Sequence, residues 1–450
     1  MRNIFIRNEE FCIKNEELCI QNEALCTQND EFCRESGYAD VADHPSWVIP
    51  WMEDDPHLGT TQLWVNRTIE HLTQAKGYGV AGALGITWRM EAVSPTLWTL
   101  ARRGWDANLT ANSAWAQWCM GEFGLPDPST SDGSSEKFAA AFGALEGAER
   151  SLAVSGCPGI VTGCMSAASS NAFTAKVQAV LHLAPLVGKS PVYQETFLVW
   201  SSLLKFIVAA ADGGCVASNY TATAARVRAL PTLAARQAVA NETLLPLRIA
   251  MVAAARNFTT LLLEATVGPG EMGMLATIHD ALLLGSCGGE CNAIKSFHEN
   301  YLNASAAGEL AGWLAGGIPA SPLPAAALPS AEYCGRERIV MGAPRSSIDA
   351  GEALPVSARV LSAAVPTQVL LHYAPLGGAD EAGSRTLNMT HTGTQGRVYT
   401  ATIPALIDGR DDLDFEYYVE AHTKGGHKYR LLWPAGAGLP GGAQTVVVMQ

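Results

Sequence analysis

The sequence predicts a multidomain chain of mixed class, in which an α/β part is followed by an α part and then a β part. Three observations support this order. Residues 47–105 alternate short apolar runs with helical patterns, residues 135–316 are rich in Ala and Leu, and residues 331–450 alternate polar with apolar residues. We therefore expect β/α units, a helical bundle and a C-terminal β-sandwich.

Composition excludes several classes of partner. The chain has 450 residues, 48% of them hydrophobic and 16% charged, with a formal net charge of −13. Nucleic acids and anionic membranes are bound by basic faces, so we expect neither partner. No run of 18 apolar residues occurs, and the best candidate, residues 196–211, is interrupted by Lys205. We therefore predict no membrane span.

The N-terminal segment 1–36 carries a heptapeptide repeat: NEEFCIK, NEELCIQ, NEALCTQ and NDEFCRE. Each unit has three adjacent apolar residues, which do not form the seam of a coiled coil. We expect this segment to be disordered or to reflect an error in the gene model. A basic region followed by an apolar region, typical of a signal peptide, is not visible in this chain. The expectation is that the true N-terminus is missing or wrongly assigned.

Asparagine usage indicates a secretory route. Chance predicts roughly one or two Asn-X-Ser/Thr sequons, although a Thr/Ala-rich composition raises that rate. The chain has seven: Asn66, Asn108, Asn219, Asn241, Asn257, Asn303 and Asn388. We therefore expect a glycoprotein that is secreted or resides in an endomembrane lumen.

Cysteine spacing agrees with an oxidising compartment. Cys287 and Cys291 could close one tight disulfide loop, and Cys157 and Cys164 a second one. A zinc site is the alternative, but neither pair has the two-residue spacing of a zinc ribbon. We favour disulfides. The seven cysteines outside the repeat leave one thiol unpaired, or paired outside this chain.

The α/β part begins with an apolar run at 47–51, read as a buried strand. A helical stripe follows up to Gly77, a second apolar run covers 80–88, and a Ser-Pro helix start opens 94–105. This is the β-α-β-α repeat of a parallel α/β fold.

The helical part follows a linker at 126–134. Its expected stops are Gly156-Cys157-Pro158, Gly213-Gly214 and Gly268-Pro269-Gly270, which predict a bundle of five to seven helices. A Pro/Ala-rich linker covers 317–330. The β part then offers five strand patterns, at 353–361, 367–376, 397–406, 414–423 and 444–449.

Tryptophans are concentrated near the predicted strands. Eight of the eleven fall within 72 residues, at positions 47, 51, 64, 88, 98, 105, 115 and 118. Indole faces stack on the C–H faces of sugar rings, so this clustering favours a sugar site. For the helical residues Trp64, Trp98 and Trp115, core filling is the alternative.

Charged residues follow the two predicted strands. The active site of a parallel α/β barrel lies at the carboxyl ends of its strands, where this chain has Trp51, Glu53 and Asp54, and then Trp88 and Arg89. Alternation places Glu53 on the same side as Trp51. Glu53 is therefore the first candidate for a catalytic carboxylate, and Asp54 is the second.

Structural roles for the same residues remain open. Asp54 or Asp55 before Pro56 could cap the next helix. Glu53 could instead form a salt bridge with Arg89, which could also bind a sugar hydroxyl or carboxylate. No phosphate loop, dinucleotide fingerprint or HExxH motif is present, so we expect no cofactor and no metal.

The strings PWMEDDP, QLWVNRTIEHL and YGVAGALGITWR resemble the last two β/α units of a secreted TIM-barrel glycoside hydrolase. The helical and sandwich parts resemble the C-terminal modules of α-glucuronidases and α-N-acetylglucosaminidases. The resemblance implies that 37–125 are the last units of a barrel. It places Glu53 at the end of the seventh strand, where many retaining enzymes keep their nucleophile. It places Trp88 at the end of the eighth, beneath a sugar.

Glycosidases need two carboxylates, and the resemblance implies that the second comes from barrel strands absent here. We therefore expect this chain to be the C-terminal portion of a secreted glycoside hydrolase that acts on a poly- or oligosaccharide. Because the second carboxylate is absent, this chain by itself could be inactive. Trp51, Trp88 and Arg89 would shape the sugar subsite. The alternative is a non-catalytic extracellular carbohydrate-binding or adhesion protein.

Overall fold

The computed structural model describes the chain from residue 47 to residue 449, with gaps. The described ranges are 47–52, 61–87, 91–127, 133–148, 167–266, 304–316, 322–330, 333–341, 344–376, 384–392, 397–405, 414–423, 430–433 and 443–449. Several predicted features lie outside them: the heptapeptide repeat, Glu53, Asp54, Trp88, Arg89, Cys157, Cys164, Cys287, Cys291 and Asn303.

The first elements form the predicted β-α-β-α unit. In order they are β1 (Trp47–Val48), α4 (Val65–Gly77), β2 (Gly82–Ala83), the short helix η2 (Glu91–Val93) and α5 (Ser94–Trp105). Strands β1 and β2 pair in parallel, with Trp47 opposite Gly82 and Val48 opposite Ala83. An isolated parallel bridge between Trp51 and Ile86 extends this pairing. The described residues contain no closed barrel, and this sheet has only these two strands.

The two faces of the β1–β2 sheet differ. Pro50 and Met52 are buried, and a Cβ placed at Gly85 would contact Leu100 of α5 and Met52. The alternate positions point the other way. A Cβ at Gly82 would contact the ring of Trp47, which is itself exposed. One face therefore packs against helix α5, and the opposite face lies open in the described part of the chain. The expectation that residues 47–51 form a buried strand is wrong for this open face, because Trp47 and Trp51 are exposed.

Helices α6 (Ala111–Phe123) and α7 (Ser134–Gly143) continue the chain. Thr110 caps α6, because its Oγ1 accepts a hydrogen bond from the backbone nitrogen of Ser113 and the Ser113 hydroxyl binds back to Thr110. Gly124 ends α6 with φ +62°, a left-handed conformation that glycine adopts without steric cost. The two helices bury an aromatic cluster of Trp115, Trp118, Phe123, Phe138 and Phe142 together with Phe197 and Trp200.

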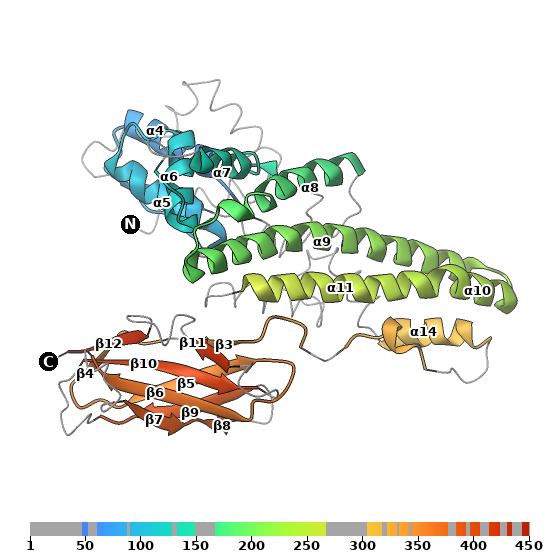
Figure 1. The fold of residues 1–450 in the computed structure, drawn as a ribbon. Coiled ribbons are helices and arrows are strands. Elements are labelled where there is room, and N and C mark those ends of the chain that lie inside the picture. Colours follow the sequence, from blue (N-terminus) through green and yellow to red (C-terminus); the bar gives the residue numbers. More distant parts are fainter. Residues whose placement is uncertain are drawn as a thin grey trace, which may run out of the picture.

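The long helices follow. They are α8 (Ala167–Leu181), η4 (Ala184–Leu186), α9 (Pro191–Ala229), α10 (Leu233–Val239), the π-helical turn η5 (Ala240–Leu244), α11 (Leu245–Ala265) and α14 (Ala304–Leu314). Helices α9 and α11 lie side by side in Figure 1 and form the long axis of the helical part. The turn η5 ends at Leu244, two residues before Pro246, whose missing backbone N–H cannot join a regular α-helical ladder.

The prediction of a helix stop at Gly213-Gly214 is wrong. Helix α9 runs through both residues from Pro191 to Ala229, and both are buried. A Cβ placed at Gly213 would lie 3.4 Å from the Cβ of Ala254 and 3.5 Å from the ring of Phe258 on α11. The small residues therefore let α11 approach α9 closely, and this packing offsets the poor helix propensity of glycine.

A single hydrophobic core joins the residues from Leu63 to Ala327. It includes part of the Pro/Ala-rich segment, since Leu323 and Ala327 are buried around the short helix η7 (Ala325–Ala327). Arg248 of α11 is also buried, and its Nε donates to the carbonyl oxygen of Ala327 at 3.0 Å. This segment therefore packs against the helical part.

Two helical segments are long and apolar enough to cross a membrane by length and composition alone. They are Pro191–Ala229 and Leu233–Ala265, among the described residues. The most apolar window of the first is 67% buried inside the protein, as in the core helix of a globular domain. The second carries two sequons, Asn241 and Asn257, both exposed.

The C-terminal part contains two sheets. The strands are β3 (Arg338–Met341), β4 (Ser347–Asp349), β5 (Leu354–Leu361), β6 (Gln368–Pro375), β7 (Arg385–Asn388), β8 (Thr390–Thr392), β9 (Val398–Ile403), β10 (Phe415–His422), β11 (Arg430–Trp433) and β12 (Gln444–Met449). One sheet has the order β4-β12-β10-β6-β7, with β11 also paired to β10, and the other has the order β3-β5-β9-β8. Only β4 and β12 pair in parallel within them.

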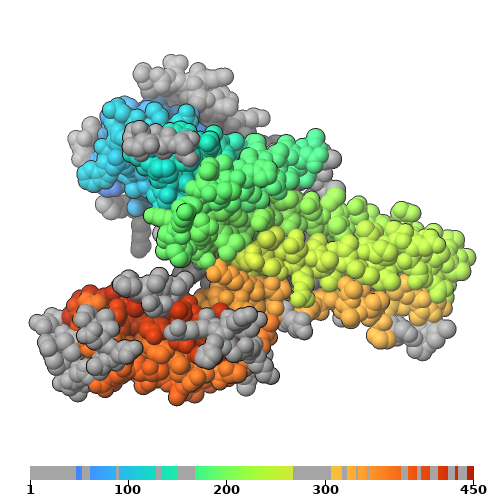
Figure 2. Space-filling model, in the orientation of Figure 1, coloured from blue at the N-terminus to red at the C-terminus, as the bar shows by residue number. Residues whose placement is uncertain are grey.

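The inward-facing residues of both sheets form one core, as two face-to-face sheets do. Alternation explains this, because β5 buries every second residue from Leu354 to Val360. All five strand patterns expected from the sequence correspond to strands here, namely β5, β6, β9, β10 and β12. Figure 2 shows these sheets as a lobe distinct from the helical part.

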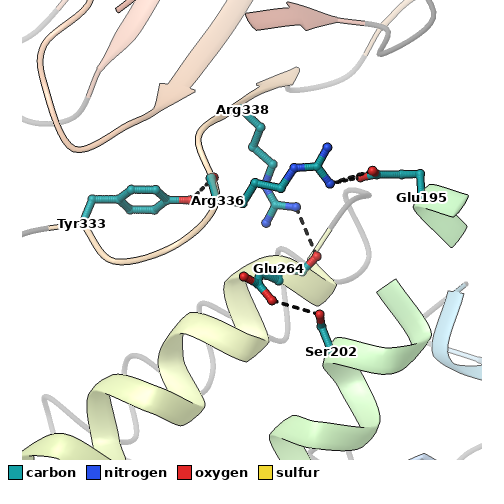
Figure 3. Close-up of polar contacts among 6 residues, drawn as sticks. All are labelled: Glu195, Ser202, Glu264, Tyr333, Arg336 and Arg338. Atoms are coloured by element: carbon teal, nitrogen blue, oxygen red, sulfur yellow. Dashed lines mark hydrogen bonds and ion pairs between the residues drawn. The ribbon is translucent and has the colours of Figure 1, made fainter. Parts of the chain in front are cut away.

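The two parts touch through a small polar contact, drawn in Figure 3. Arg336 lies just before β3, and its Nη1 is 2.6 Å from the Oε1 of Glu195 at the start of α9. Arg338 donates from Nη1 to the carbonyl oxygen of Glu264 at 3.5 Å, in the last turn of α11. The side chain of Glu264 accepts a hydrogen bond from Ser202 at 3.0 Å. This contact joins β3 to the ends of both long helices.

Candidate functional site

The parallel pairing brings two strand ends together at one edge. The backbone nitrogen of Met52 donates to the carbonyl oxygen of Ile86 at 3.0 Å, and that of Ile86 donates to Pro50 at 3.4 Å. The parallel pairing that β1 and β2 begin therefore continues to Met52 in the first segment and to Ile86 in the second, so that these two residues are neighbours. Because the strands are parallel, both ends are carboxyl ends, the edge at which α/β folds place their ligands.

The open face of this sheet is apolar. Trp47 is 60% exposed, Trp51 is 47% exposed and Leu84 is 57% exposed. We refer to these three side chains as the open apolar face. Water-exposed indoles on one face of a strand are available to pack against a sugar ring or against further protein.

The predicted catalytic residues are not among the described residues. Glu53 and Asp54 directly follow Met52, and Trp88 and Arg89 directly follow Thr87. Trp51, the residue on whose side alternation places Glu53, is exposed. That position of Glu53 stays a prediction, as do the roles of Asp54, Trp88 and Arg89. Of the predicted subsite, the structure places Trp51.

The tryptophans at positions 64, 98, 115 and 118 fill the core, unlike Trp105 at the end of α5, which is exposed. Trp64, Trp115 and Trp118 are all buried, and Trp98 packs against the same core while partly exposed. Trp115 and Trp118 meet edge to face, with ring centroids 5.7 Å apart. For these residues the core-filling alternative is correct, because aromatic rings bury large apolar areas when helices pack together.

Two glutamates that the sequence did not single out, Glu91 and Glu122, interact with each other. Glu91 opens η2 just beyond the 88–90 segment, and Glu122 lies on α6. Burial and, to a smaller extent, repulsion by Glu91 together raise the pKa of Glu122 to about 7, although a hydrogen bond with Trp200 partly opposes them. No spacing in the sequence links positions 91 and 122, so only the fold reveals this pair.

A carboxyl group with a pKa near neutrality can hold or release a proton at physiological pH. Glu122, however, bonds to Trp200, which is almost fully buried in the helical core. The thiol of Cys119 lies in the same core, and burial followed by the charge of Glu122 raises the pKa of that thiol well above its usual range. The half-buried Glu122 therefore lies against the helical core, where its titration affects stability.

The sequon asparagines occupy the surface wherever the structure describes them. Six of the seven are described, and all six are exposed: Asn66, Asn108, Asn219, Asn241, Asn257 and Asn388. The Nδ2 of Asn66 donates to the Oε2 of Glu146 at 2.8 Å, which leaves one of its two amide hydrogens for other use. Exposed side chains are what N-linked glycans require, so attachment at these six positions stays a prediction that the fold permits.

One disulfide involves a cysteine for which the sequence predicted no pairing. Cys215 of α9 is disulfide-bonded, while Cys119 and Cys334 are free thiols. These three are the only cysteines in the described ranges, so the partner of Cys215 lies outside them. The pairings Cys287 with Cys291 and Cys157 with Cys164 stay predictions.

Within the described ranges, no group of three His, Cys, Asp or Glu side chains could hold a metal ion. Comparison with protein-family models, with curated proteins and with solved structures finds no match to this chain. The function must therefore be argued from the strand-end edge and the open apolar face.

Proposed function

We propose that this chain is the C-terminal portion of a secreted glycoside hydrolase, and that β1 and β2 are the last two strands of its (β/α) barrel. The parallel pairing of residues 47–51 with 82–86 is the observation that carries the proposal. It joins, at one carboxyl edge, the two segments from which the sequence expects Glu53, Trp88 and Arg89 to project.

The incompleteness of the sheet supports a barrel. A parallel sheet buries both of its faces, and here one face packs against α5 while the other exposes Trp47, Trp51 and Leu84. Additional parallel strands would pair with the free edges and cover that face. A closed ring of strands does both at once, with the open face turned toward the centre of the barrel.

The chemistry of the edge supports a sugar substrate. Trp51 presents an indole to solvent at the isolated bridge that extends the β1–β2 pairing, and the acidic string Glu53-Asp54 follows two residues later. In a retaining enzyme Glu53 would act as the nucleophile, and a second carboxyl from another strand would protonate the leaving oxygen. Trp51 and Trp88 would bind the sugar face, and Arg89 would bind a hydroxyl or carboxylate.

The surface and the disulfide support the compartment. Six sequon asparagines are exposed, and Cys215 is disulfide-bonded, a bond that persists in oxidising compartments. We therefore place the protein outside the cell or in an endomembrane lumen.

The exposed indoles also favour a second candidate, a non-catalytic carbohydrate-binding or adhesion protein. Such a protein would use Trp51 and its neighbours for affinity alone and would need no second carboxylate. The two candidates share the sugar site and differ in hydrolysis.

Sugar binding tests both candidates first. The full chain would be screened on an oligosaccharide array, together with Trp51→Ala and Trp47→Ala. Trp47 lies on the same open apolar face but at the amino end of β1, roughly 13 Å from Trp51 at about 3.3 Å per residue. We expect Trp51→Ala to abolish binding and Trp47→Ala to retain it. Absence of binding, or equal losses in the two variants, would reject the sugar site.

Glu53→Gln separates the two candidates. In a hydrolase it preserves binding and removes glycoside cleavage by the assembled barrel, whereas in a binding protein no cleavage exists to be removed. The transcript upstream of Ser36 gives an independent answer. Six further β/α units in frame would support the hydrolase, and a transcript that lacks them would support the binding protein.

A further inference from the structure

The end of helix α5 carries an unusual surface residue. Trp105 is 91% exposed, the highest value among the exposed large hydrophobic side chains of the described residues. An indole exposed to solvent leaves a large apolar area in contact with water, and this contact costs a free energy of about 25 cal/mol per Å² of apolar surface. Three residues later the chain has the sequon Asn108-Leu109-Thr110, and Asn108 is exposed as well.

The segment between the two side chains is a fixed turn. The backbone nitrogen of Leu109 donates to the carbonyl oxygen of Asp106 at 3.2 Å, which closes the turn. The backbone nitrogen of Asn108 donates to the Asp106 carboxylate at 2.9 Å. Asn108 is therefore the third residue of a turn that begins just after Trp105.

The side chain of Arg103 stabilises this turn through hydrogen bonds. Its Nη1 donates to the carbonyl oxygens of Asp106 at 3.3 Å and of Leu109 at 3.4 Å, and also to that of Ala107. Its Nη2 donates to the hydroxyl of Thr73 on α4 at 3.0 Å. One guanidinium thus ties the turn together and ties it to a neighbouring helix. The positions of Trp105 and Asn108 are consequently set by the folded protein and not by a free loop.

We propose that the N-linked glycan on Asn108 folds back onto this turn and packs its first N-acetylglucosamine against the indole of Trp105. The group that covers the exposed indole is then a sugar attached to the same turn. The sugar has an apolar C–H face that suits an indole and hydroxyls that suit water. The inference needs passage through a secretory compartment but does not depend on glycoside hydrolysis.

The attachment is ordinary N-glycosylation. The amide nitrogen of Asn108 forms a bond to the anomeric carbon of a sugar carried on a lipid pyrophosphate, the amide loses one proton, and the lipid pyrophosphate leaves. Thr110 supplies the hydroxyl of the sequon and, after folding, caps α6. A test must therefore change Asn108 and leave Thr110 intact.

The placement separates this glycan from the candidate sugar site. Helix α5 begins at Ser94, seven residues after Thr87 in the sequence, and ends at Trp105. Its twelve residues span roughly 18 Å at about 1.5 Å per residue. The first sugar on Asn108 therefore packs at the end of α5 opposite to Ser94.

A double-mutant cycle tests the proposal. The full chain and the variants Asn108→Gln, Trp105→Ala and the double variant would be made in a secreting eukaryotic host, with occupancy of Asn108 read by glycopeptide mass spectrometry. We expect Asn108→Gln to raise the unfolding equilibrium constant roughly twofold to tenfold when Trp105 is present, the range known for paired aromatic groups. In the Trp105→Ala background the same change should have little effect.

Asn257 supplies the matched control. It is an exposed sequon on α11, and Phe258, its only aromatic sequence neighbour within four positions, is buried. Asn257→Gln should therefore combine additively with Trp105→Ala. An Asn108 without a glycan, or an effect of Asn108→Gln that is the same in both backgrounds, overturns the proposal.

A second measurement tests the proposal even if the Asn108→Gln variant does not fold. The glycans of the folded wild-type and Trp105→Ala proteins would be removed enzymatically at the Asn–sugar bond. Destabilisation of the wild-type protein that clearly exceeds that of Trp105→Ala supports the packing, and equal destabilisation overturns it.

Discussion

Replacing Glu122 with glutamine should change how stability depends on pH. Burial, reinforced by repulsion from Glu91, raises the pKa of Glu122 from 4.5 to about 7 in the folded protein. Between these two values the folded protein binds more protons than the unfolded chain. Stability therefore falls as pH rises through this window, and the loss is complete above about pH 7.

The magnitude follows from the two pKa values. The difference between 4.5 and about 7 is about 2.5 units, which corresponds to roughly 3 kcal/mol at about 1.36 kcal/mol per unit. Partial exposure of the carboxylate to solvent lowers this to about 2 kcal/mol. The glutamine side chain carries no charge, and its amide oxygen can still accept the hydrogen bond from Trp200. We expect the Glu122→Gln variant to be more stable than the wild type by about 2 kcal/mol at about pH 8, and nearly unchanged at about pH 4.5.

Urea unfolding at these two pH values, followed by tryptophan fluorescence, measures the effect. Trp115, Trp118 and Trp200 are buried in the same core as Glu122, so the signal reports on the helical part. Glu70→Gln on the exposed surface of α4 is the control for losing one negative charge. A Glu122→Gln protein with the same pH dependence as the wild type would refute the reasoning.

Three further predictions concern packing and the contact between the two parts. Gly124→Ala should lower the free energy of unfolding by about 2 kcal/mol, because Gly124 has positive φ and the added Cβ would overlap the ring of Tyr193; a thermal melt as high as that of the wild type would contradict this. Gly213→Ala should stabilise by about 0.5–1 kcal/mol because helix propensity improves and the Cβ fits against Ala254, whereas Gly213→Val should destabilise by about 1–3 kcal/mol through overpacking. A urea midpoint higher for Gly213→Val than for Gly213→Ala would show that the packing of α11 does not restrict the size of the side chain at this position. Arg336→Ala should cost less than about 1 kcal/mol, since its ion pair with Glu195 is solvent-exposed, and the cost should shrink in salt; a loss that salt leaves unchanged would assign Arg336 a packing role.

Local pattern was sufficient for many elements. The Ser-Pro start at residue 94 and the end at Trp105 coincide with the bounds of α5, and the QTVVVM pattern coincides with β12. These segments fold as their periodicity requires, because each buries one face against a neighbour. The alternation in 47–51 likewise predicted that Trp47 and Trp51 share one side, but not that this side is exposed.

Short strands and tertiary exceptions were not predictable in this way. Strands β4 and β8 have only three residues each, too few to show a period, and they form only because a longer strand offers hydrogen bonds. Gly213-Gly214 has the composition of a helix stop, yet α9 continues through it because α11 packs there.

For the candidate site, the sequence determined which residue types follow the strands, and it identified the exposed sequons. Only the tertiary structure could show that Trp51 lies beside Ile86, that Trp115 and Trp118 belong to the core, and that Glu122 is repelled by Glu91. The physical reason is distance along the chain. Hydrophobic period and turn chemistry act over a few residues, whereas strand pairing, burial and charge repulsion join positions that no local pattern connects.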